Sequence, residues 1–364
     1  MFAPSLAIIE DKTLFKISFF VITIFNAWTF AYGYDWMNYY DTFLDVQAGT
    51  VETFFTEPGY LILMEVSNFL GLNFPQFSAC VTILMYMSIY SFCNKMENPN
   101  LAFFTLYSFL SFFMLTEQIR QGLALCILLF GVYALYYGRT KRFIVIVLIS
   151  SLFHISAVMA FLFLFIRGTS EKGLYKFTLA ASIFVVALLY SLYHPELFSS
   201  LPLIGPKVAA YARLSEEKDV GFWSYVLGSR LVFIYLFLYI FLFSVRKSER
   251  SIYSGVGAVF VLFLSRLSPY LVRVGYYFVP YLVISVDRYM TTQGRGLYSK
   301  LNKLVYISVI FMVATIPAWN PVYWQGSKTF LTINSDVSEI NKEITRKCKI
   351  LHENYDHIVI MQCL

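Results

Sequence analysis

Long apolar runs recur along almost the whole of this 364-residue chain. A helix needs about 20 mainly apolar residues to cross the hydrocarbon core of a bilayer. The candidate runs lie at 14–32, 76–93, 100–116, 119–137, 143–166, 174–192, 223–245, 252–268, 270–286 and 303–317. They are continuous rather than alternating with a period of two, which disfavours a β-barrel. The sequence therefore predicts an all-α, polytopic membrane protein with about ten or eleven transmembrane helices.

The charged residues are few and unevenly placed. Hydrophobic residues make up 58% of the chain and charged residues only 14%, whereas soluble domains contain about 25% charged residues. Much of the net charge of +6 lies in short basic loops at 139–142 and 246–250. Such loops are typical of the cytoplasmic side of a membrane protein and not of a nucleic-acid surface. We therefore expect membrane lipid, and no nucleic acid, among the partners.

The chain divides into a predicted polytopic membrane domain, 1–317, and a polar C-terminal tail, 318–364. Within the domain, 33–58 has five carboxylates and no Lys or Arg, so we place it outside the membrane. Segment 194–222 is predicted to be a long extracytoplasmic loop. The tail contains Val337, Ile340 and Ile344, spaced for a short amphipathic helix. Cys348 and Cys363 could pair if the tail faces an oxidising compartment.

The shorter apolar segment 59–72 contains Glu65 and leaves two topologies open. If it does not cross the membrane, the basic cluster at 139–142 falls inside and Arg120 lies near the outer face. If it crosses, that cluster falls outside, against the positive-inside rule. The later basic clusters prefer the opposite parity, so a break or re-entrant piece is required between 143 and 222.

Arg120 and His154 are the first candidates for chemistry. Arg120 opens one apolar run and His154 lies well inside the next. Ionisable groups at membrane depth usually face a cavity, a partner or a ligand. The planar guanidinium of Arg120 suits a phosphate or carboxylate, although Arg120 could instead extend to the interface while pairing with Glu117. His154 could act as a base or be a hydrogen-bonded core residue.

Further candidates come from the outer segment and the later runs. Asp35 and Glu57 bracket the acidic segment, where a carboxylate could act as a general base or simply be solvated. Arg230 and Arg273 lie within later runs and suggest a cationic cavity for an anionic ligand, whereas Arg266 is expected to extend to the interface. The remaining candidates are predicted to contact sugar: Gln121, Tyr276 and Tyr277.

Several nucleotide and metal motifs are missing from the sequence. It contains no P-loop, no G-x-G-x-x-G at a strand–helix junction and no Cys/His spacing for zinc. ATP-driven transport and nucleotide-sugar chemistry therefore lack their usual machinery. We expect no cofactor and no metal.

Four short motifs occur in a recognisable order. They are D-W-x-N-Y-Y-D at Asp35–Asp41, E-P-G-Y at Glu57–Tyr60, I-R-Q-G-L-A at Ile119–Ala124 and F-H-I-S-A at Phe153–Ala157. In this order they resemble the EpsG-type polysaccharide polymerases, which are similar to Wzy-type O-antigen and capsule polymerases. The stretch from Arg273 to Phe278 resembles a later segment of that family. The resemblance is good over 30–160 and loose elsewhere.

The resemblance implies a membrane glycosyltransferase in the bacterial inner membrane, with its active site facing the periplasm or exterior. Such an enzyme transfers a polyprenyl-diphosphate-linked glycan onto a sugar hydroxyl of an incoming lipid-linked repeat unit, and we expect it to be metal-independent. Flippase and chain-length regulator proteins are candidate partners in lipopolysaccharide or capsule biosynthesis. The alternatives are a flippase of the lipid-linked oligosaccharide and a glycan ligase.

The residues suggest roles in that reaction. The lipid diphosphate is the leaving group, and Arg120, Arg230 and Arg273 could stabilise its developing charge. His154, Asp35 or Glu57 could accept the proton of the acceptor hydroxyl.

Overall fold

The computed structural model describes residues 10–51, 57–166, 170–198, 227–246, 252–267, 271–292, 297–326, 330–354 and 360–363. Over this part of the chain the protein is all-α, as predicted, and its one small sheet pairs β1 (Thr29–Phe30) with β2 (Leu331–Thr332). The chain forms two compact units, one of 1–158 with 303–364 and the other of 159–302. Most of the predicted loop 194–222 lies outside the described residues.

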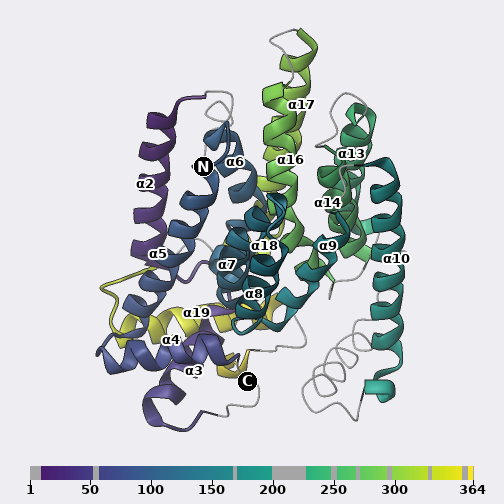
Figure 1. Ribbon diagram of the computed structural model, residues 1–364. Helices are drawn as coiled ribbons and strands as arrows, with labels where there is room; N and C mark the ends of the chain where they lie inside the picture. Colours follow the sequence, from purple (N-terminus) through teal and green to yellow (C-terminus); the bar gives the residue numbers. More distant parts are fainter. Residues whose placement is uncertain are drawn as a thin grey trace. The chain divides into compact units, whose positions relative to one another are not determined.

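The first unit contains a group of packed apolar helices (Figure 1). Its helices before residue 158 are α2 (Lys12–Trp28), α3 (Trp36–Ala48), α4 (Pro58–Phe69), α5 (Phe74–Cys93), α6 (Pro99–Leu110), the π-helix η1 (Phe113–Glu117), α7 (Ile119–Tyr136) and α8 (Thr140–Ser151). Helix α7 packs against α5 and α8, and α5 packs against α2. Helix α5 starts at a capping box in which Asn73 and Gln76 bond each other's backbone N–H groups.

The first unit also includes the later part of the chain. Its elements there are most of α17 (Leu297–Ala314), η6 (Ile316–Trp319), α18 (Pro321–Gly326), β2, α19 (Val337–Asn354) and the 3₁₀ turn η7 (Met361–Cys363). The predicted amphipathic helix in the tail is thus present and longer than its three apolar residues suggested. Cys348 and Cys363 form a disulfide that joins α19 to η7.

The second unit is built around α14. Its elements are the second half of η2 (Ile155–Leu162), α9 (Phe163–Ile166), α10 (Glu171–Tyr193), η3 (Pro195–Phe198), α13 (Arg230–Val245), α14 (Ile252–Leu264), η4 (Ser265–Leu267), α15 (Val272–Gly275), η5 (Tyr276–Phe278) and α16 (Val279–Thr292). Helices α10, α13 and α16 pack against α14. Two of these contacts are close because α14 has glycines there. The missing Cβ of Gly255 gives room to Ser285 on α16, and that of Gly257 gives room to Phe177 on α10.

Three described helices are long and apolar enough to span a membrane: α5, α7 and α17. Shorter apolar helices include α13 and the stretch from Ile252 to Leu267. The predicted span at 143–166 is wrong as a continuous helix, because α8 ends at Ser151 and a 3₁₀ helix begins at Ile155. This interruption at 152–154 contains His154 and falls within 143–222, where the loop charges call for a break.

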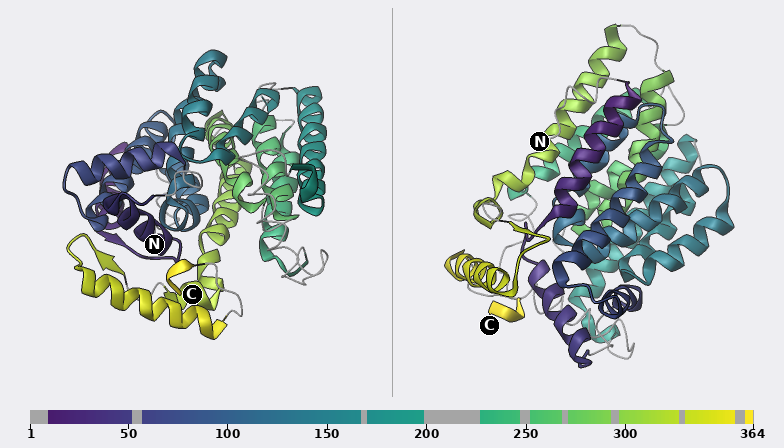
Figure 2. Two further views of the ribbon diagram at one scale, coloured as in Figure 1. Left: turned by 90° about the horizontal axis from the view of Figure 1, so that it is seen from below. Right: turned by 90° about the vertical axis from the view of Figure 1, so that its left-hand side faces the viewer.

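Segment 59–72 forms the 12-residue helix α4, shorter than a bilayer crossing needs. In Figures 1 and 2, α4 and α19 run across the ends of α2 and α5 instead of alongside them. Helix α3 packs against α4, and η7 packs against α3. This arrangement favours the topology in which 59–72 does not cross, with α3, α4 and α19 gathered at one end of the unit.

Candidate functional site

Arg120 lies in the first turn of α7, directly after the π-helix η1. The chain turns tightly there, and Gly122 makes the turn possible, because a Cβ at this position would overlap the Met114 carbonyl. The side chain of Arg120 is 31% exposed. A cation is thus held at the end of a membrane-length helix and stays accessible.

Glu57 is the ion-pair partner of Arg120. Its Oε2 lies 2.7 Å from Arg120 Nη1, and the carboxylate is only 8% exposed. Glu57 precedes Pro58, which occupies the first turn of α4 and suits a helix start. On another side, the Arg120 guanidinium carbon lies 5.3 Å from the centre of the Tyr39 ring, on α3. The guanidinium is therefore oriented by a carboxylate and an aromatic ring from two different elements.

His154 completes the cluster. Its Nδ1 lies 3.8 Å from Glu57 Oε1 and 3.2 Å from Ser156 Oγ, and its side chain is 18% exposed. The helix break brings it there, because the Leu152 carbonyl accepts a hydrogen bond of 2.9 Å from the backbone N–H of Gly59. A Cβ at Gly59 would lie 3.0 Å from that carbonyl oxygen, so glycine allows the close approach.

The four short sequence motifs thus meet in space. Tyr39, Glu57, Arg120 and His154 each come from a different one of them. The predicted combination of a cation with a possible base is present, with Glu57 between Arg120 and His154. We refer to Arg120, Glu57 and His154 as the charged triad, a name that refers to its guanidinium and carboxylate.

Glu117 does not pair with Arg120, which corrects one of the sequence-based alternatives. Its carboxylate accepts backbone N–H groups of Tyr34, at 2.9 Å, and of Asp35, at 3.2 Å. It passes so close to Gly33 that a Cβ there would overlap it. Burial raises the pKa of Glu117, and the nearby Asp35 raises it further. Asp35 is therefore close to the element that leads into α7, and its role as a base stays a prediction.

The remaining predicted residues differ in burial, and none of them belongs to the charged triad. Gln121, on α7, is fully buried. In the second unit, Arg230 begins α13 and is exposed, Arg273 is half-buried, and Tyr276 and Tyr277 are buried. Their contacts with diphosphate or sugar stay predictions.

Arg266 differs from its sequence-based expectation. It is buried rather than extended to an interface, and it donates hydrogen bonds to the Tyr276 hydroxyl at 2.8 Å and the Tyr235 hydroxyl at 3.4 Å. Both bonds are made by Nη2, whereas the buried Nε has no hydrogen-bond partner among the described residues, and sequence spacing does not reveal this pairing with the tyrosines.

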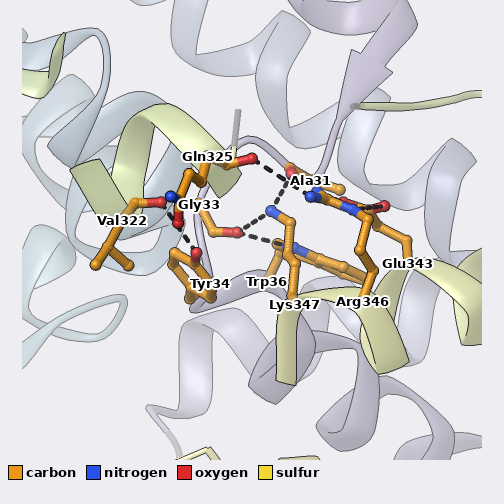
Figure 3. A network of polar contacts seen from close by, with 9 residues as sticks. All are labelled: Ala31, Gly33, Tyr34, Trp36, Val322, Gln325, Glu343, Arg346 and Lys347. Atoms are coloured by element: carbon orange, nitrogen blue, oxygen red, sulfur yellow. Dashed lines mark hydrogen bonds and ion pairs between the residues drawn. The ribbon is translucent and has the colours of Figure 1, made fainter. Parts of the chain in front are cut away.

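Lys347 is a buried charge that sequence reasoning missed. It lies on α19 and is fully buried, and its ammonium donates to the carbonyls of Ala31 and Gly33 (Figure 3). A signal was present in the sequence, because Ile340, Glu343, Lys347 and Leu351 share helical spacing and all four are buried. The charges at two of these positions concealed the buried face.

A cavity of about 350 Å³ lies at the other end of α7. It is lined by Lys95, Arg139 and Arg142 together with the aromatic residues Phe130, Tyr133 and Tyr137. At 1.5 Å per residue, this end of α7 is about 24 Å from Arg120. The basic cluster that is typical of a cytoplasmic face and the charged triad are therefore at opposite ends of one helix.

Among the residues that the structure describes, no three His, Cys, Asp or Glu side chains come together as metal ligands. Metal independence remains a prediction, as does the absence of a cofactor.

The comparisons with known proteins agree with the motifs. A model of the EpsG family matches residues 12–329. Searches of curated proteins and of solved structures gave no match. The matched range includes every member of the charged triad and ends before β2 and α19. The chain is a helical membrane protein that belongs to the EpsG family, with a role of the polysaccharide-polymerase type.

Proposed function

We propose that the protein polymerises lipid-linked glycan repeat units. It transfers a growing glycan from its polyprenyl diphosphate to a sugar hydroxyl of an incoming unit. The observation that supports this best is the charged triad, in which an accessible guanidinium and an imidazole are both next to one buried carboxylate. Such a transfer needs a cation for the leaving diphosphate and a base for the acceptor hydroxyl.

The exposures of the three side chains favour different roles. Arg120 is the most exposed at 31%, so it is available to a diphosphate, which its planar fork can bind through two parallel hydrogen bonds. Glu57 is 8% exposed and already bonded to Arg120, which favours an orienting role over that of base. His154, 18% exposed and beside the Ser156 hydroxyl, is the better candidate for the base.

In the proposed step, the acceptor hydroxyl oxygen attacks the anomeric carbon of the donor glycan. A new glycosidic C–O bond forms while the bond between that carbon and the phosphate oxygen breaks. The hydroxyl proton passes to His154, and the bonding electron pair leaves with the lipid diphosphate. Arg120 stabilises the charge that develops on the diphosphate, and Glu57 keeps the guanidinium in position. No nucleotide is required, because the donor is already activated.

Two observations support an outer-face location for this chemistry. The charged triad lies at the end of α7 opposite the basic cavity. The elements near it include α3, whose Asp41 accepts a hydrogen bond of 3.4 Å from Gln362, next to the Cys348–Cys363 disulfide. Disulfides persist in oxidising compartments. The periplasm or cell exterior is therefore the proposed side.

The test uses purified protein in vesicles containing a synthetic polyprenyl-diphosphate oligosaccharide. Wild-type protein should give a ladder of polymers on a gel. Arg120→Lys should give no product beyond one repeat, because an ammonium cannot reproduce the two-donor fork. Arg139→Lys, at the other end of α7, is the matched control and should give the wild-type ladder. A wild-type ladder from Arg120→Lys would contradict the proposed role of Arg120 at the leaving diphosphate.

A flippase is the second candidate, favoured by the helix break at 152–154. Discontinuous helices are common at the substrate sites of transporters. In cells without the protein, loss of a polymerase leaves single lipid-linked units on the outer face, whereas loss of a flippase leaves them inside. Labelling of those units from outside the membrane distinguishes the two functions.

A further inference from the structure

The segment that follows the family match is attached to the turn that precedes α3. We call residues 330–354 and 360–363 the C-terminal segment, and Ala31–Asp35 the 31–35 turn. Strand β2 pairs antiparallel with β1, with Thr332 opposite Thr29 and Leu331 opposite Phe30. Ile333 adds a backbone hydrogen bond of 2.9 Å to the Trp28 carbonyl. The ladder places the C-terminal segment directly beside the start of the turn.

Lys347 then inserts a buried ammonium into the turn itself. Figure 3 shows its Nζ directed at the carbonyl oxygens of Ala31 and Gly33, and the Trp36 indole N–H bonded to the same Gly33 oxygen at 3.1 Å. A buried ammonium without such acceptors would be very costly. The need for these two carbonyls therefore fixes the position of the Lys347 ammonium.

The backbone of the turn is strained where Lys347 binds. Ala31 has φ of 69°, the one positive φ of a non-glycine residue among the described residues. A residue with a Cβ rarely adopts this conformation and holds it only when its surroundings over-determine it. The hydrogen bond from Lys347 and the β1–β2 ladder supply that constraint.

Glu117 holds the same turn through a second set of contacts. Its carboxylate accepts the N–H groups of Tyr34 and Asp35, and the absence of a side chain on Gly33 lets it approach. Glu117 is three residues before Arg120, at the entry to α7. The turn is thus fixed between a cation of the C-terminal segment and an anion at the base of the charged triad. The turn leads into α3, whose Tyr39 lies against the Arg120 guanidinium.

We propose that Lys347 and Glu117 are positioning residues for the charged triad, and that the C-terminal segment is a built-in brace without which the family's membrane domain in this chain turns over poorly. The inference rests on the proposed function for its catalytic part. Its structural part, the hold on the 31–35 turn, is testable without substrate.

The first experiment measures amide hydrogen exchange of the 31–35 turn in the purified full-length protein. Lys347→Met keeps the length of the side chain and removes its charge and donors. The Tyr34 and Asp35 amides should exchange at least about tenfold faster. Lys349→Met, on the same helix but 79% exposed, is the control and should leave their exchange unchanged. Unchanged exchange in Lys347→Met would overturn the brace.

The second experiment measures turnover in vesicles with the lipid-linked oligosaccharide. Lys347→Met should lower kcat about tenfold while KM stays within about twofold, because a misplaced site loses transition-state contacts. Ile310→Val, in the buried core of α17, is the control for general loss of stability and should keep wild-type kcat. Faster exchange with wild-type kcat would overturn the positioning role.

The outcomes separate this inference from the proposed function. If the wild-type protein makes no polymer, the proposed function fails while the exchange experiment still tests the brace. If Lys347→Met does not fold, the double variant Lys347→Met/Glu117→Gln replaces it, since removing both charges leaves neither buried alone. The double variant should also show faster exchange and lower kcat, and wild-type values for both would overturn the inference.

Discussion

The charged triad and the Lys347–Glu117 arrangement use the same kinds of side chain for different purposes. Arg120 is 31% exposed and pairs with one carboxylate, so a ligand can reach it and compete for it. Lys347 is fully buried and its donors are bonded to backbone carbonyls, so no ligand can reach it without opening the fold. Exposure and partner type, rather than charge, distinguish a group that can act on substrate from one that fixes a backbone.

The comparison predicts that variants of the triad lose activity while they stay folded, and that variants around the 31–35 turn lose stability as well. Arg120→Ala should show the first behaviour most strongly. Loss of a preorganised cation at the leaving group should lower kcat by about 1,000-fold. Turnover in vesicles and the thermal unfolding midpoint of the same sample measure both effects. A midpoint that falls as far as that of a core variant would contradict the distinction.

His154→Ala should have the next largest effect. Removal of a general base lowers rates by about 100-fold or more, and His154 is accessible enough for its loss to leave the fold intact. The measurement is kcat as a function of pH, with Ser151→Ala, half-buried on α8 and bonded to the Leu148 carbonyl of its own helix, as the control. A residual rate with the wild-type pH profile would show that another group is the base, and Asp35→Asn would be the next variant to measure.

Gly33→Ala tests the prediction that variants around the 31–35 turn lose stability. The new Cβ must displace the Glu117 carboxylate, which would leave the Tyr34 and Asp35 N–H groups without their acceptor. We expect a loss of about 2 kcal/mol in the free energy of unfolding, since buried unsatisfied donors cost about 1–3 kcal/mol each. Denaturant unfolding measures it, and Gly228→Ala, where nothing crowds the Cβ, is the control.

Ala31→Gly should act in the opposite direction. Its left-handed φ of 69° suits glycine, so the substitution should stabilise the protein by about 1 kcal/mol. A rise in the unfolding midpoint checks this expectation. A fall would mean that the methyl group of Ala31, buried in the structure, contributes more through packing than the strain costs.

The smallest expected effect concerns pH. Because burial raises the pKa of Glu117 above 4.5, the folded state binds this proton more tightly than the unfolded state. Its contribution to stability is complete below the unfolded pKa and is lost as the pH rises through the folded pKa. The side chain that Glu117→Gln introduces does not titrate. The thermal unfolding midpoint of the wild type should therefore fall relative to that of the variant as the pH rises from the unfolded pKa of Glu117 through its folded pKa. A constant difference between them would indicate that Glu117 has an ordinary pKa.

The sequence identified the members of the triad better than it identified their contacts. The positions of Arg120, His154 and Glu57 were identified because ionisable residues beside apolar runs are rare enough to stand out. The ion pair between Arg120 and Glu57 was not predicted, since the two are 63 residues apart and the nearer Glu117 offered a local partner. The loop charges called for a break somewhere between 143 and 222 but did not place it, and the interruption at His154 is accompanied by the hydrogen bond between Gly59 and Leu152, which sequence does not reveal.

By itself the sequence determined the membrane class, the helical architecture and the family motifs, because hydropathy and short local patterns act over neighbouring residues. Tertiary structure alone decided which charges meet: that Glu57 lies between Arg120 and His154, that Glu117 holds the 31–35 turn, and that Lys347 enters it from α19. The physical reason is that a charge near hydrocarbon is stable only with suitable partners. Such partners are chosen by distance in space, which chain packing sets and sequence separation does not.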